Sequence, residues 1–580
     1  MAVLKSSWAL RSFDENQAET LSRDLGVSEL FARLLSLRGV SDASSARQFL
    51  EPELKDLHDP FSMKGVDLAV ERILDALKRD ERIWVFGDYD VDGITSTSVL
   101  LLFLRRLGLD VSFYIPSRLD EGYGLSVEGV DKIADAGCQL LVTVDCGVSD
   151  IEPVARAVER GMEVIVIDHH QVGDELPKAV AILNPHQEFC AFPTQDLAAV
   201  GVVFNLILAL RSRLREGGYF VDREEPNLRE FLDLVALGTI ADIVPLVGEN
   251  RVIVRHGLEE LTAGRRPGVA ALKEVAGLFN AEVTVGQVAF RMAPRINAVG
   301  RLGMAELGVE LMTTRSYSDA LRLARKLDQS NSKRQDIERD IFTAALKQAE
   351  VERERGQKQA LVLASQDWHV GVIGIVASRL VDRFKCPVVM IAMGEDSGRG
   401  SARSAQGVHL YEALHTCREL LDSYGGHRSA AGLSVSSENL EKFRKAFLNE
   451  VERQIENDAA TYQMEVDAEV PPSSLTQEDV EKLAELSPHG LGNPEPVFLA
   501  RHLIVRSSRL VGREEPLHLK LTLLDGDRQF GAIGFRMGHR KGDVTEEIDL
   551  LYTPEFNTWN GTTSIQLRIK DLRPSYRGDL

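Results

Sequence analysis

Cysteines are few in this sequence, and none lies close to another. The chain has five cysteines and no C-x-x-C pair. This spacing excludes a disulfide framework and a thiolate zinc site, and it fits a protein of the reducing cytoplasm. The five are Cys138, Cys146, Cys190, Cys386 and Cys417.

Long apolar runs are also missing. The N-terminal residues MAVLKSSWALRSF lack the apolar core of a signal peptide. The longest apolar stretch, near Val200 to Leu210, is interrupted by Asn205 and is too short to cross a bilayer. We therefore expect a soluble, cytoplasmic protein that does not bind membranes.

Positive charge is scarce as well. The chain has 68 Lys and Arg against 88 Asp and Glu, which gives a net charge of −20 at pH 7. This balance excludes a protein that coats nucleic acid through bulk electrostatics, so any polyanion must be bound by local cationic groups. The hydrophobic fraction of 44% is that of a globular protein, and 580 residues suffice for three or four domains.

Strands and helices alternate along much of the chain. The apolar segments RIWVF (82–86), QLLVTV (139–144) and EVIVI (163–167) are separated by helical patterns. Strands that are apolar throughout indicate a parallel sheet covered on both faces. QALVLAS and PVVMIAM predict a second α/β unit, and the alternation in HLKLTLLD and SIQLRI, with an Asn560-Gly561 turn, predicts a small OB-type β-barrel.

These patterns divide the chain into five expected segments. Their order is a helical lead-in, an α/β parallel-sheet domain, a long connecting helix, a second α/β domain and the C-terminal barrel. The expected boundaries are 1–55, 56–304, 305–357, 358–460 and 461–580.

Acidic residues and histidines follow three of the predicted strands. RIWVF leads into GDYDVDG with Asp88, Asp90 and Asp92, QLLVTV leads into Asp145, and EVIVI leads into Asp168-His169-His170. The carboxyl ends of the strands in an open α/β sheet line one crevice, so these side chains are expected to meet there. Carboxylates packed so closely need a cation, and oxygen with imidazole ligands suits Mn²⁺ or Mg²⁺.

The acidic segment also fits two simpler roles. Asp-rich loops are common in turns and helix caps. The spacing D-x-D-x-D-G also occurs in EF-hands, but the twelfth position of such a loop should be Glu, and here it is Val99. Acidic residues follow three separate strands, which favours a metal site over a structural loop and over an EF-hand.

Together, GDYDVDG, VDCG, DHH and GTIADIVPL resemble the four motifs of the DHH phosphoesterase superfamily. The segments APRINAVGRLG (293–303), WHVGVIGIVASRL (368–380), GRGSARSAQGVHL (398–410), GGHRSAAG (425–432) and GLGNPEPVF (490–498) narrow the resemblance. In that order, with a barrel after them, they resemble the bacterial single-strand-specific DNA exonucleases of the superfamily. The resemblance covers nearly the whole chain from about residue 60.

The resemblance implies a DHH domain, a DHH-associated domain and an OB-type barrel. It implies one or two Mn²⁺ or Mg²⁺ ions bound by Asp90, Asp92, Asp145, His169 and Asp242, with Asp145 bridging. Asp168 would orient His169, and His170 would face the scissile phosphate. Many members carry histidine where this chain has Phe86, so Asp88 or water could take the place of that ligand.

The resemblance also implies where the substrate binds. Arg118, Ser401 and Arg403 would hold the 5′-phosphate, and His427 would contact the nucleotide beside it. Arg295 and Arg301 lie in a stretch with three arginines and no acidic residue. Residues 501–580 carry thirteen Lys and Arg against eleven Asp and Glu, which favours a strand-binding barrel, although Phe556 and Trp559 each fit a core position more simply.

The implied activity is 5′ to 3′ digestion of single-stranded DNA to 5′-mononucleotides in recombination and repair. The implied partners are single-stranded DNA, a single-strand-binding protein and a recombination helicase, and a monomer is expected. Two alternatives stay open: hydrolysis of short RNA or cyclic dinucleotides, and an inactive scaffold that only binds strands. The residues themselves give neither the polarity nor the choice of DNA over RNA.

Overall fold

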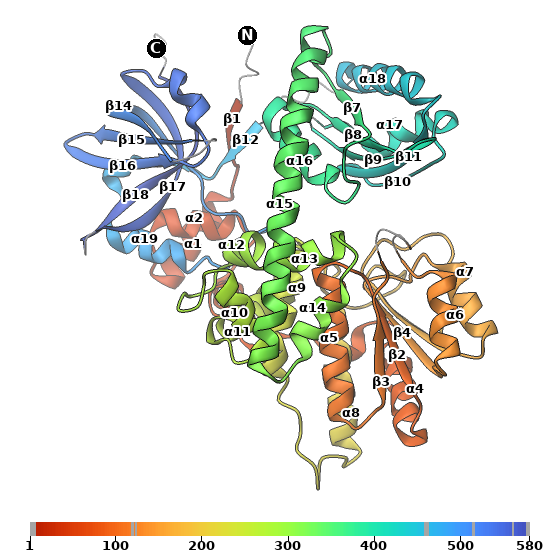
Figure 1. Cartoon of the computed structure of the whole chain (residues 1–580). Coiled ribbons are helices and arrows are strands. Elements are labelled where there is room, and N and C mark those ends of the chain that lie inside the picture. Colours follow the sequence, from red (N-terminus) through yellow and green to blue (C-terminus); the bar gives the residue numbers. More distant parts are fainter. Residues whose placement is uncertain are drawn as a thin grey trace. The chain divides into compact units, whose positions relative to one another are not determined.

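The computed structural model describes residues 7–117, 121, 124–405, 407–457, 463–512, 517–559 and 562–575 (Figure 1). The chain forms two compact units, each made of segments far apart in the sequence. One unit comprises Met1–Leu57, Pro245–Arg255 and Gln463–Leu580, and the other comprises His58–Val244 and His256–Tyr462. Among the described residues, no helix is both long enough and apolar enough to cross a membrane.

The second unit begins with a five-stranded parallel sheet in the order β3-β2-β4-β5-β6. Its strands are β2 (Ile83–Gly87), β3 (Val111–Tyr114), β4 (Leu140–Val144), β5 (Glu163–Ile167) and β6 (Ala181–Leu183). The chain runs from β2 to β3 on one side and then to β4 on the other side of β2. The order therefore reverses between β2 and β4, and the crevice at such a point is where ligands bind in sheets of this kind.

Helices cover both faces of this sheet, as the apolar strands predict. Figure 1 shows α6 and α7 on one side and α5 and α8 on the other. The helices of this domain are α4 (Val66–Arg79), α5 (Val91–Arg106), α6 (Val127–Asp135), α7 (Ile151–Glu159), α8 (Ala199–Glu216) and α9 (Leu232–Ala241).

A helical region follows and ends in a helix of 38 residues. Its elements are α10 (Gly248–Ala263), α11 (Pro267–Val275), α12 (Val285–Gln287), a π-helix (Val288–Met292), α13 (Ala293–Arg301), α14 (Glu306–Thr313) and α15 (Tyr317–Glu354). The expectation of one helix over 305–357 is wrong, because the helix is interrupted between Thr313, the end of α14, and Tyr317, the start of α15. Ser316 has extended backbone there, and its side chain accepts a hydrogen bond from the Asp319 N–H, which starts α15 anew.

The second α/β domain contains a mixed sheet in the order β10-β11-β9-β8-β7. Its strands are β7 (Leu361–Ser365), β8 (Val388–Met393), β9 (Ser397–Arg403), β10 (Ser423–Gly426) and β11 (Ala430–Ser436). Its helices are α16 (Ile373–Phe384), α17 (Leu410–Thr416) and α18 (Leu440–Asn457). Only β7 and β8 are parallel, and the other neighbours are antiparallel.

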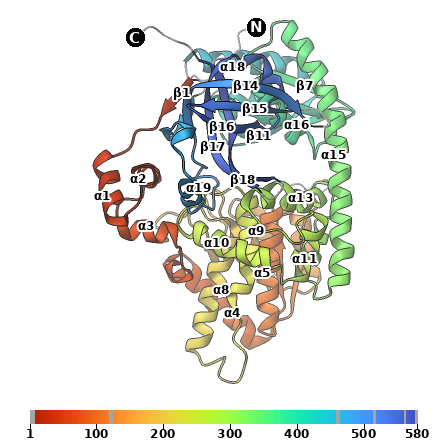
Figure 2. The same cartoon turned by 90° about the vertical axis from the view of Figure 1, so that its left-hand side faces the viewer.

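The first unit is built around a closed five-stranded barrel, visible in Figure 2. Its strands are β14 (Phe498–Val511), β15 (His518–Asp525), β16 (Arg528–Gly534), β17 (Glu547–Trp559) and β18 (Thr562–Pro574), with β14 also pairing with β17. β12 (Gln463–Val466), β13 (Ala468–Glu469) and α19 (Gln477–Ala484) precede it. The predicted Asn560-Gly561 turn lies outside the described residues, between strands that pair antiparallel.

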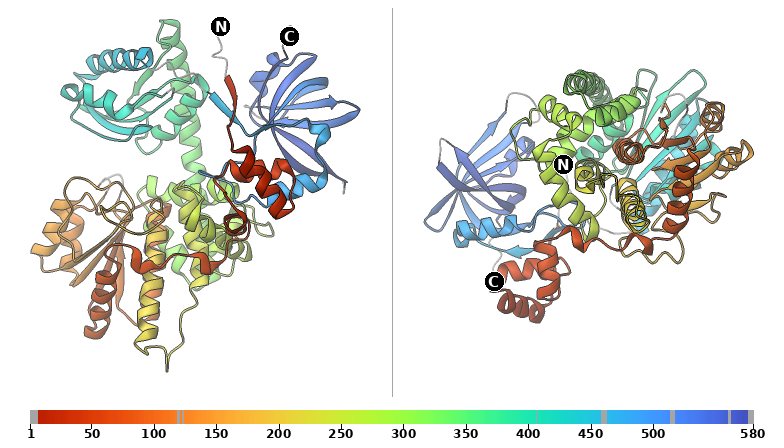
Figure 3. Two further views of the ribbon diagram at one scale, coloured as in Figure 1. Left: turned by 180° about the vertical axis from the view of Figure 1, so that it is seen from behind. Right: turned by 90° about the horizontal axis from the view of Figure 1, so that it is seen from below.

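The N-terminal residues pack against this barrel (Figure 3). They form α1 (Glu15–Leu25), α2 (Glu29–Ser36) and α3 (Ala43–Leu50), as predicted, and also β1 (Ser7–Leu10), a strand that the sequence did not suggest. β1 pairs in parallel with β12. Leu21, Phe31 and Leu35 share one core with barrel residues such as Phe498 and Tyr552, so the two ends of the chain fold together.

Candidate active site

The acidic residues after β2 occupy the start of α5. Asp90 is the N-cap of α5, and its Oδ1 accepts hydrogen bonds from the N–H groups of Asp92 (2.8 Å) and Gly93 (3.1 Å). This is ordinary capping chemistry, and it also fixes the direction of the following acidic side chains. Asp88 and Asp92 are buried, whereas Asp90 is partly exposed.

Asp92 is held by a second helix. Its carboxylate accepts hydrogen bonds from the N–H groups of Ala199 (2.6 Å) and Val200 (2.9 Å), at the start of α8. A helix N-terminus stabilises a negative charge. Burial nevertheless outweighs these contacts and, with the charge of Asp90, raises the pKa of Asp92 to about 7.

Two residues at the site have strained backbones. Asp145, directly after β4, has φ of 62°, and Ile243, directly after Asp242, also has φ of 62°. Aspartate tolerates this left-handed conformation, but a β-branched residue rarely adopts it. Left-handed backbone at one candidate ligand, Asp145, and directly after another, Asp242, is typical of a functional site.

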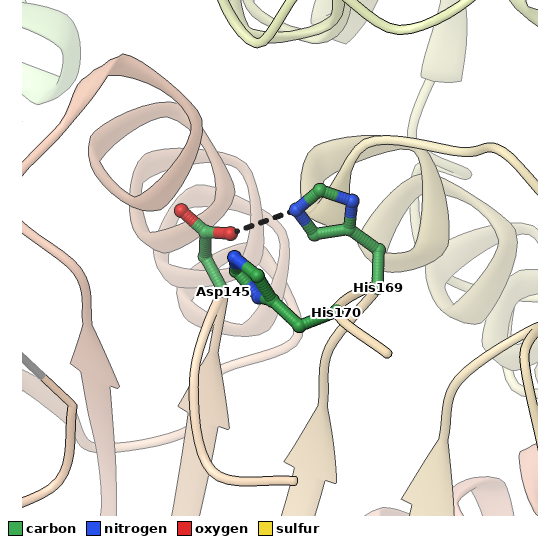
Figure 4. Close-up of side chains that lie close together, drawn as sticks. All are labelled: Asp145, His169 and His170. Carbon is green, nitrogen blue, oxygen red and sulfur yellow. Dashed lines mark ion pairs between the residues drawn. The ribbon is translucent and has the colours of Figure 1, made fainter. Parts of the chain in front are cut away.

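His169 points its Nε2 atom at three carboxylates. That atom lies 3.2 Å from Asp145 Oδ1, 3.6 Å from Asp242 Oδ2 and 3.9 Å from Asp92 Oδ2 (Figure 4 shows the Asp145 contact). The Leu197 carbonyl accepts a hydrogen bond from the same ring. Burial, together with the nearby charge of His170, lowers the pKa of His169 to about 4, so the ring is neutral near pH 7.

Asp168 contacts the ring of His170 and not that of His169, which corrects the sequence-based prediction. Its Oδ1 lies 2.7 Å from His170 Nδ1, and Val148 N–H donates to its Oδ2. Burial alone would raise the pKa of Asp168, but the hydrogen bonds from His170 and Val148 lower it overall. Burial lowers the pKa of His170. The hydrogen bond to Asp168 and the charge of that carboxylate outweigh the effect of burial and raise the pKa to about 9.

These residues fit a site for divalent cations. Three groups of possible ligands have their donor atoms within 4.8 Å of one another: Asp145 with His169 and His170, Asp92 with His169 and Asp242, and Asp88 with Asp90 and Asp145. His169 Nε2 is buried and has no hydrogen-bond partner among the described residues. A neutral imidazole with an unused lone pair beside buried carboxylates is a metal-ligand arrangement.

The electrostatics of the carboxylates point the same way. Burial, with repulsion from Asp92 and Asp90, raises the pKa of Asp242 to about 8, and burial with the other aspartates raises that of Asp145 well above its usual range. Such shifts mean that the ionised cluster is unfavourable without a counter-charge. A bound cation would supply that charge.

Phe86 takes no part in this cluster. Its ring is fully buried and stacks on Tyr114, with ring centroids 5.6 Å apart, in a core that includes Val130 and Ile133 of α6. The residue therefore serves packing between the sheet and α6. Asp88, two residues later, is grouped with Asp90 and Asp145 and is the oxygen donor nearest in sequence.

The raised pKa values predict that cation binding depends on pH. The carboxyls of Asp92 and Asp242 must lose their protons to bind a metal, so protons compete below about pH 7 to 8. Without metal, these raised pKa values cost folding stability as pH rises from the usual aspartate range to about 8. The stabilisation by Mn²⁺ should therefore grow from pH 6 to pH 8, by about 1.4 kcal/mol per pH unit for each proton released.

Thermal unfolding with and without MnCl₂ at pH 6, 7 and 8 checks this expectation. Asp92→Asn with Asp242→Asn should weaken the pH dependence of the shift in Tm. An Mn²⁺-induced shift that is equal at all three pH values would contradict it.

Ser401 and Arg403 meet at the start of α16. Arg403 Nη1 donates to Ser401 Oγ (3.0 Å), and a Cβ atom at Gly374 would lie 2.9 Å from Ser401 Oγ and 3.1 Å from Arg403 Nη2. A larger residue at position 374 would therefore displace the Ser401 and Arg403 side chains. Arg301 approaches the same segment, since its Nη1 donates to the Gly371 carbonyl (2.8 Å). Cationic groups beside the N-terminus of a helix form an anion site.

Two of the other predicted substrate residues, Arg295 and His427, lie within the described residues. The Arg295 guanidinium donates to Asp328 Oδ1 (2.9 Å) and to the carbonyls of Val275 and Arg291, so it links helices, and its contact with substrate stays a prediction. His427 follows β10 and is exposed, and its N–H donates to Ala430 O (2.8 Å). Arg118 lies outside the described residues.

Sequence reasoning missed the groups that support the site through their backbone. The Leu197 carbonyl orients His169, and the N–H groups of Ala199 and Val200 hold Asp92. The side chains of these residues are apolar, so their residue types gave no indication of a role at the site. The role of Ala199 and Val200 becomes visible only in the folded structure, where the start of α8 lies beside Asp92 of α5.

Three family models match the chain. They are the DHH family N-terminal domain over residues 82–239, the DHHA1 domain over residues 357–453 and the RecJ OB domain over residues 466–571. The single-stranded-DNA-specific exonuclease RecJ of Dickeya dadantii is 40% identical over 572 residues, which covers 96% of this chain and 98% of that protein. RecJ of Bacillus subtilis is 37% identical, covering 99% of this chain and 72% of that protein.

Solved structures agree with these matches. RecJ of Thermus thermophilus in complex with Mn²⁺ superposes with a TM-score of 0.84 at 31% identity, covering 98% of this chain and 80% of that one. The same protein in complex with Mg²⁺ gives a TM-score of 0.78 at 30% identity. The sheet edge with its three ligand groups thus lies in a fold shared along nearly the whole chain, and the chain belongs to the RecJ exonuclease family of DHH phosphoesterases.

Proposed function

We propose that this protein is a metal-dependent 5′ to 3′ exonuclease that degrades single-stranded DNA to 5′-mononucleotides in recombination and repair. The observation that carries the proposal is the meeting of His169 Nε2 with the carboxylates of Asp92, Asp145 and Asp242. The relatives named RecJ are described as single-stranded-DNA-specific exonucleases, which supports the substrate class.

The residues of the chain have distinct proposed roles. Asp88, Asp90 and Asp145 would hold one cation, and Asp92, His169, Asp242 and the bridging Asp145 the other. When bound, Mn²⁺ or Mg²⁺ lowers the pKa of a water and polarises the scissile phosphate. His170, kept protonated by Asp168, would donate a hydrogen bond from Nε2 to a phosphate oxygen.

The barrel and the partners belong to the same proposal. Residues 466–571 match the RecJ OB domain, and we infer that this barrel binds single strands. Phe556 is partly exposed on β17, so it is available for base stacking. We also propose a cytoplasmic monomer that works with a single-strand-binding protein and a recombination helicase.

One assay tests the proposal directly. Single-stranded and duplex oligonucleotides, of DNA and of RNA, carry a label at either end and are incubated with Mn²⁺, Mg²⁺ or chelator. Loss of a 5′ label as mononucleotide from single-stranded DNA, only with metal, is the expected result. Release from the 3′ end first, or equal cleavage of RNA, would overturn the polarity or the substrate.

Recognition of the strand end should depend on Arg403. A terminal 5′-phosphate carries additional charge and acceptor oxygens, which suit the fork of an arginine. Arg403→Ala should cost roughly 1.5 to 3 kcal/mol in kcat/KM on 5′-phosphorylated strands, and much less on 5′-hydroxyl strands. Matched oligonucleotides with the two ends measure this difference, and an equal loss on both would show that Arg403 does not recognise the end.

A further inference from the structure

One arginine of the second α/β domain lies on the same sheet face as the Ser401–Arg403 pair. Side chains alternate along a strand, so Arg399, Ser401 and Arg403 share one face of β9. The intervening Ala402 is buried on the other face, in a core with Leu433 and Phe443. Figure 1 shows α17 and α18 packed on one side of this sheet.

The face that carries Arg399 is lined by small residues toward the edge of the sheet. Gly432 of β11 pairs with Ser401 of β9, and Gly425 of β10 pairs with Gly432. Both glycines are exposed. A Cβ atom at Gly425 would meet nothing within 4 Å, and one at Gly432 would meet only the Gly400 carbonyl at 3.9 Å. The sheet face beside Ser401 therefore carries no side chain at these two positions, and Arg399 lies on the same face two residues away along β9.

The side chain of Arg399 is exposed and makes no hydrogen bond or ion pair with the residues that the structure describes. Other arginines of this region are engaged: Arg379 pairs with Glu338, and Arg428 donates to Gly407 O. An unengaged guanidinium keeps all of its donors for a ligand. The chain has a net charge of −20, so an unpaired cation on the face of the candidate phosphate site is a local group that can attract a polyanion.

The distance along β9 suits a second contact with the same ligand. Residues two apart on a strand are separated by roughly 6.7 Å, so Arg399 and Ser401 can reach different phosphates of one extended strand. Phosphate contacts of this kind position a nucleic acid without reading its sequence.

We propose that Arg399 holds an internucleotide phosphate of a single strand whose 5′ end lies at Ser401 and Arg403. This inference rests on the proposed function. The strand crosses the exposed face over Gly432, where a side chain would obstruct it. Arg399 is a positioning residue: it fixes the strand and takes no part in bond cleavage.

The first test compares Arg399→Ala with Arg418→Ala, which removes the same charge from another exposed arginine paired with Glu419. Binding of a 5′-phosphorylated single strand is followed by fluorescence anisotropy without metal, and turnover with Mn²⁺. Arg399→Ala should raise Kd and KM roughly fivefold to tenfold, leave kcat unchanged, and reduce the slope of log K against log salt by about 0.7. Arg418→Ala should resemble wild type.

Strands with a single neutral methylphosphonate linkage locate the contact. Wild type should bind less tightly when the neutral linkage occupies one particular position near the 5′ end, and Arg399→Ala should be insensitive at that position alone. Equal sensitivity of both proteins at every position would overturn the inference.

The second test blocks the path without removing charge. Gly432→Val should not lower Tm, because a Cβ atom there would meet nothing closer than the Gly400 carbonyl at 3.9 Å, yet it should raise KM on long strands. Unchanged binding by Gly432→Val and Arg399→Ala, in a wild type that digests single strands from the 5′ end, refutes this inference and leaves the proposed function intact. A wild type that neither binds nor digests such strands refutes both.

Discussion

Asp145→Asn should lower the rate of strand digestion by at least roughly three orders of magnitude. Asp145 belongs to two of the three ligand groups, and its Oδ1 is the carboxylate oxygen closest to His169 Nε2. Cation stabilisation of a phosphoryl transition state is worth several kcal/mol, and each 1.36 kcal/mol is about tenfold in rate. Asparagine keeps the side-chain shape and tolerates the φ of 62° at this position.

The same substitution should not destabilise the metal-free protein. Burial and neighbouring aspartates raise the pKa of Asp145, so its ionised form is unfavourable in the folded state, and a neutral amide relieves that cost. Tm without metal should equal or exceed that of wild type, while the Mn²⁺-induced rise in Tm should largely disappear.

The matched control is Asp110→Ala, at the opposite end of the strands, where Asp110 is exposed and paired with Arg82. It should retain activity and the Mn²⁺ response. Digestion by Asp145→Asn within tenfold of wild type, or an undiminished Mn²⁺ response, would remove Asp145 from the candidate site.

Asp168→Asn should reduce kcat about a hundredfold without preventing metal binding. Asp168 is in none of the ligand groups, but it accepts the hydrogen bond from His170 Nδ1 and raises the pKa of that ring to about 9. Groups that orient an active-site residue in this way typically contribute tenfold to a hundredfold. With asparagine the pKa of His170 falls, so the protonated ring is lost at lower pH.

A pH profile separates this role from a structural one. A group with a raised pKa loses its proton as pH rises through that value, so the alkaline limb of kcat in wild type should move to lower pH in Asp168→Asn. The Mn²⁺-induced rise in Tm should stay within about a degree of wild type. An unchanged alkaline limb would show that Asp168 does not act through His170.

Local patterns predicted the strands and the acidic strand ends correctly. RIWVF, QLLVTV and EVIVI became β2, β4 and β5 within a residue or two, because strands buried on both faces must be apolar along their whole length. Since parallel strands end at one edge of the sheet, the same patterns predicted that Asp92, Asp145 and His169 would meet.

Other features depended on which residues the tertiary structure brings together. Asp168 could have oriented either histidine, and only the turn after β5 decides for His170. Arg295 and Arg399 look equally suited to phosphate in the sequence, yet Asp328, 33 residues away, neutralises only the first. The sequence shows that a residue is charged but not which residue it pairs with in the folded protein.

The packing of the chain ends is the clearest case. By itself the sequence determined a helical N-terminal segment and a C-terminal barrel, because helix and strand periodicities are local. It could not determine that Phe31 and Phe498 share one core. The hydrophobic effect is non-directional, so the sequence does not show which apolar face packs against which. The tertiary structure alone decided that the two ends of the chain form one folded unit.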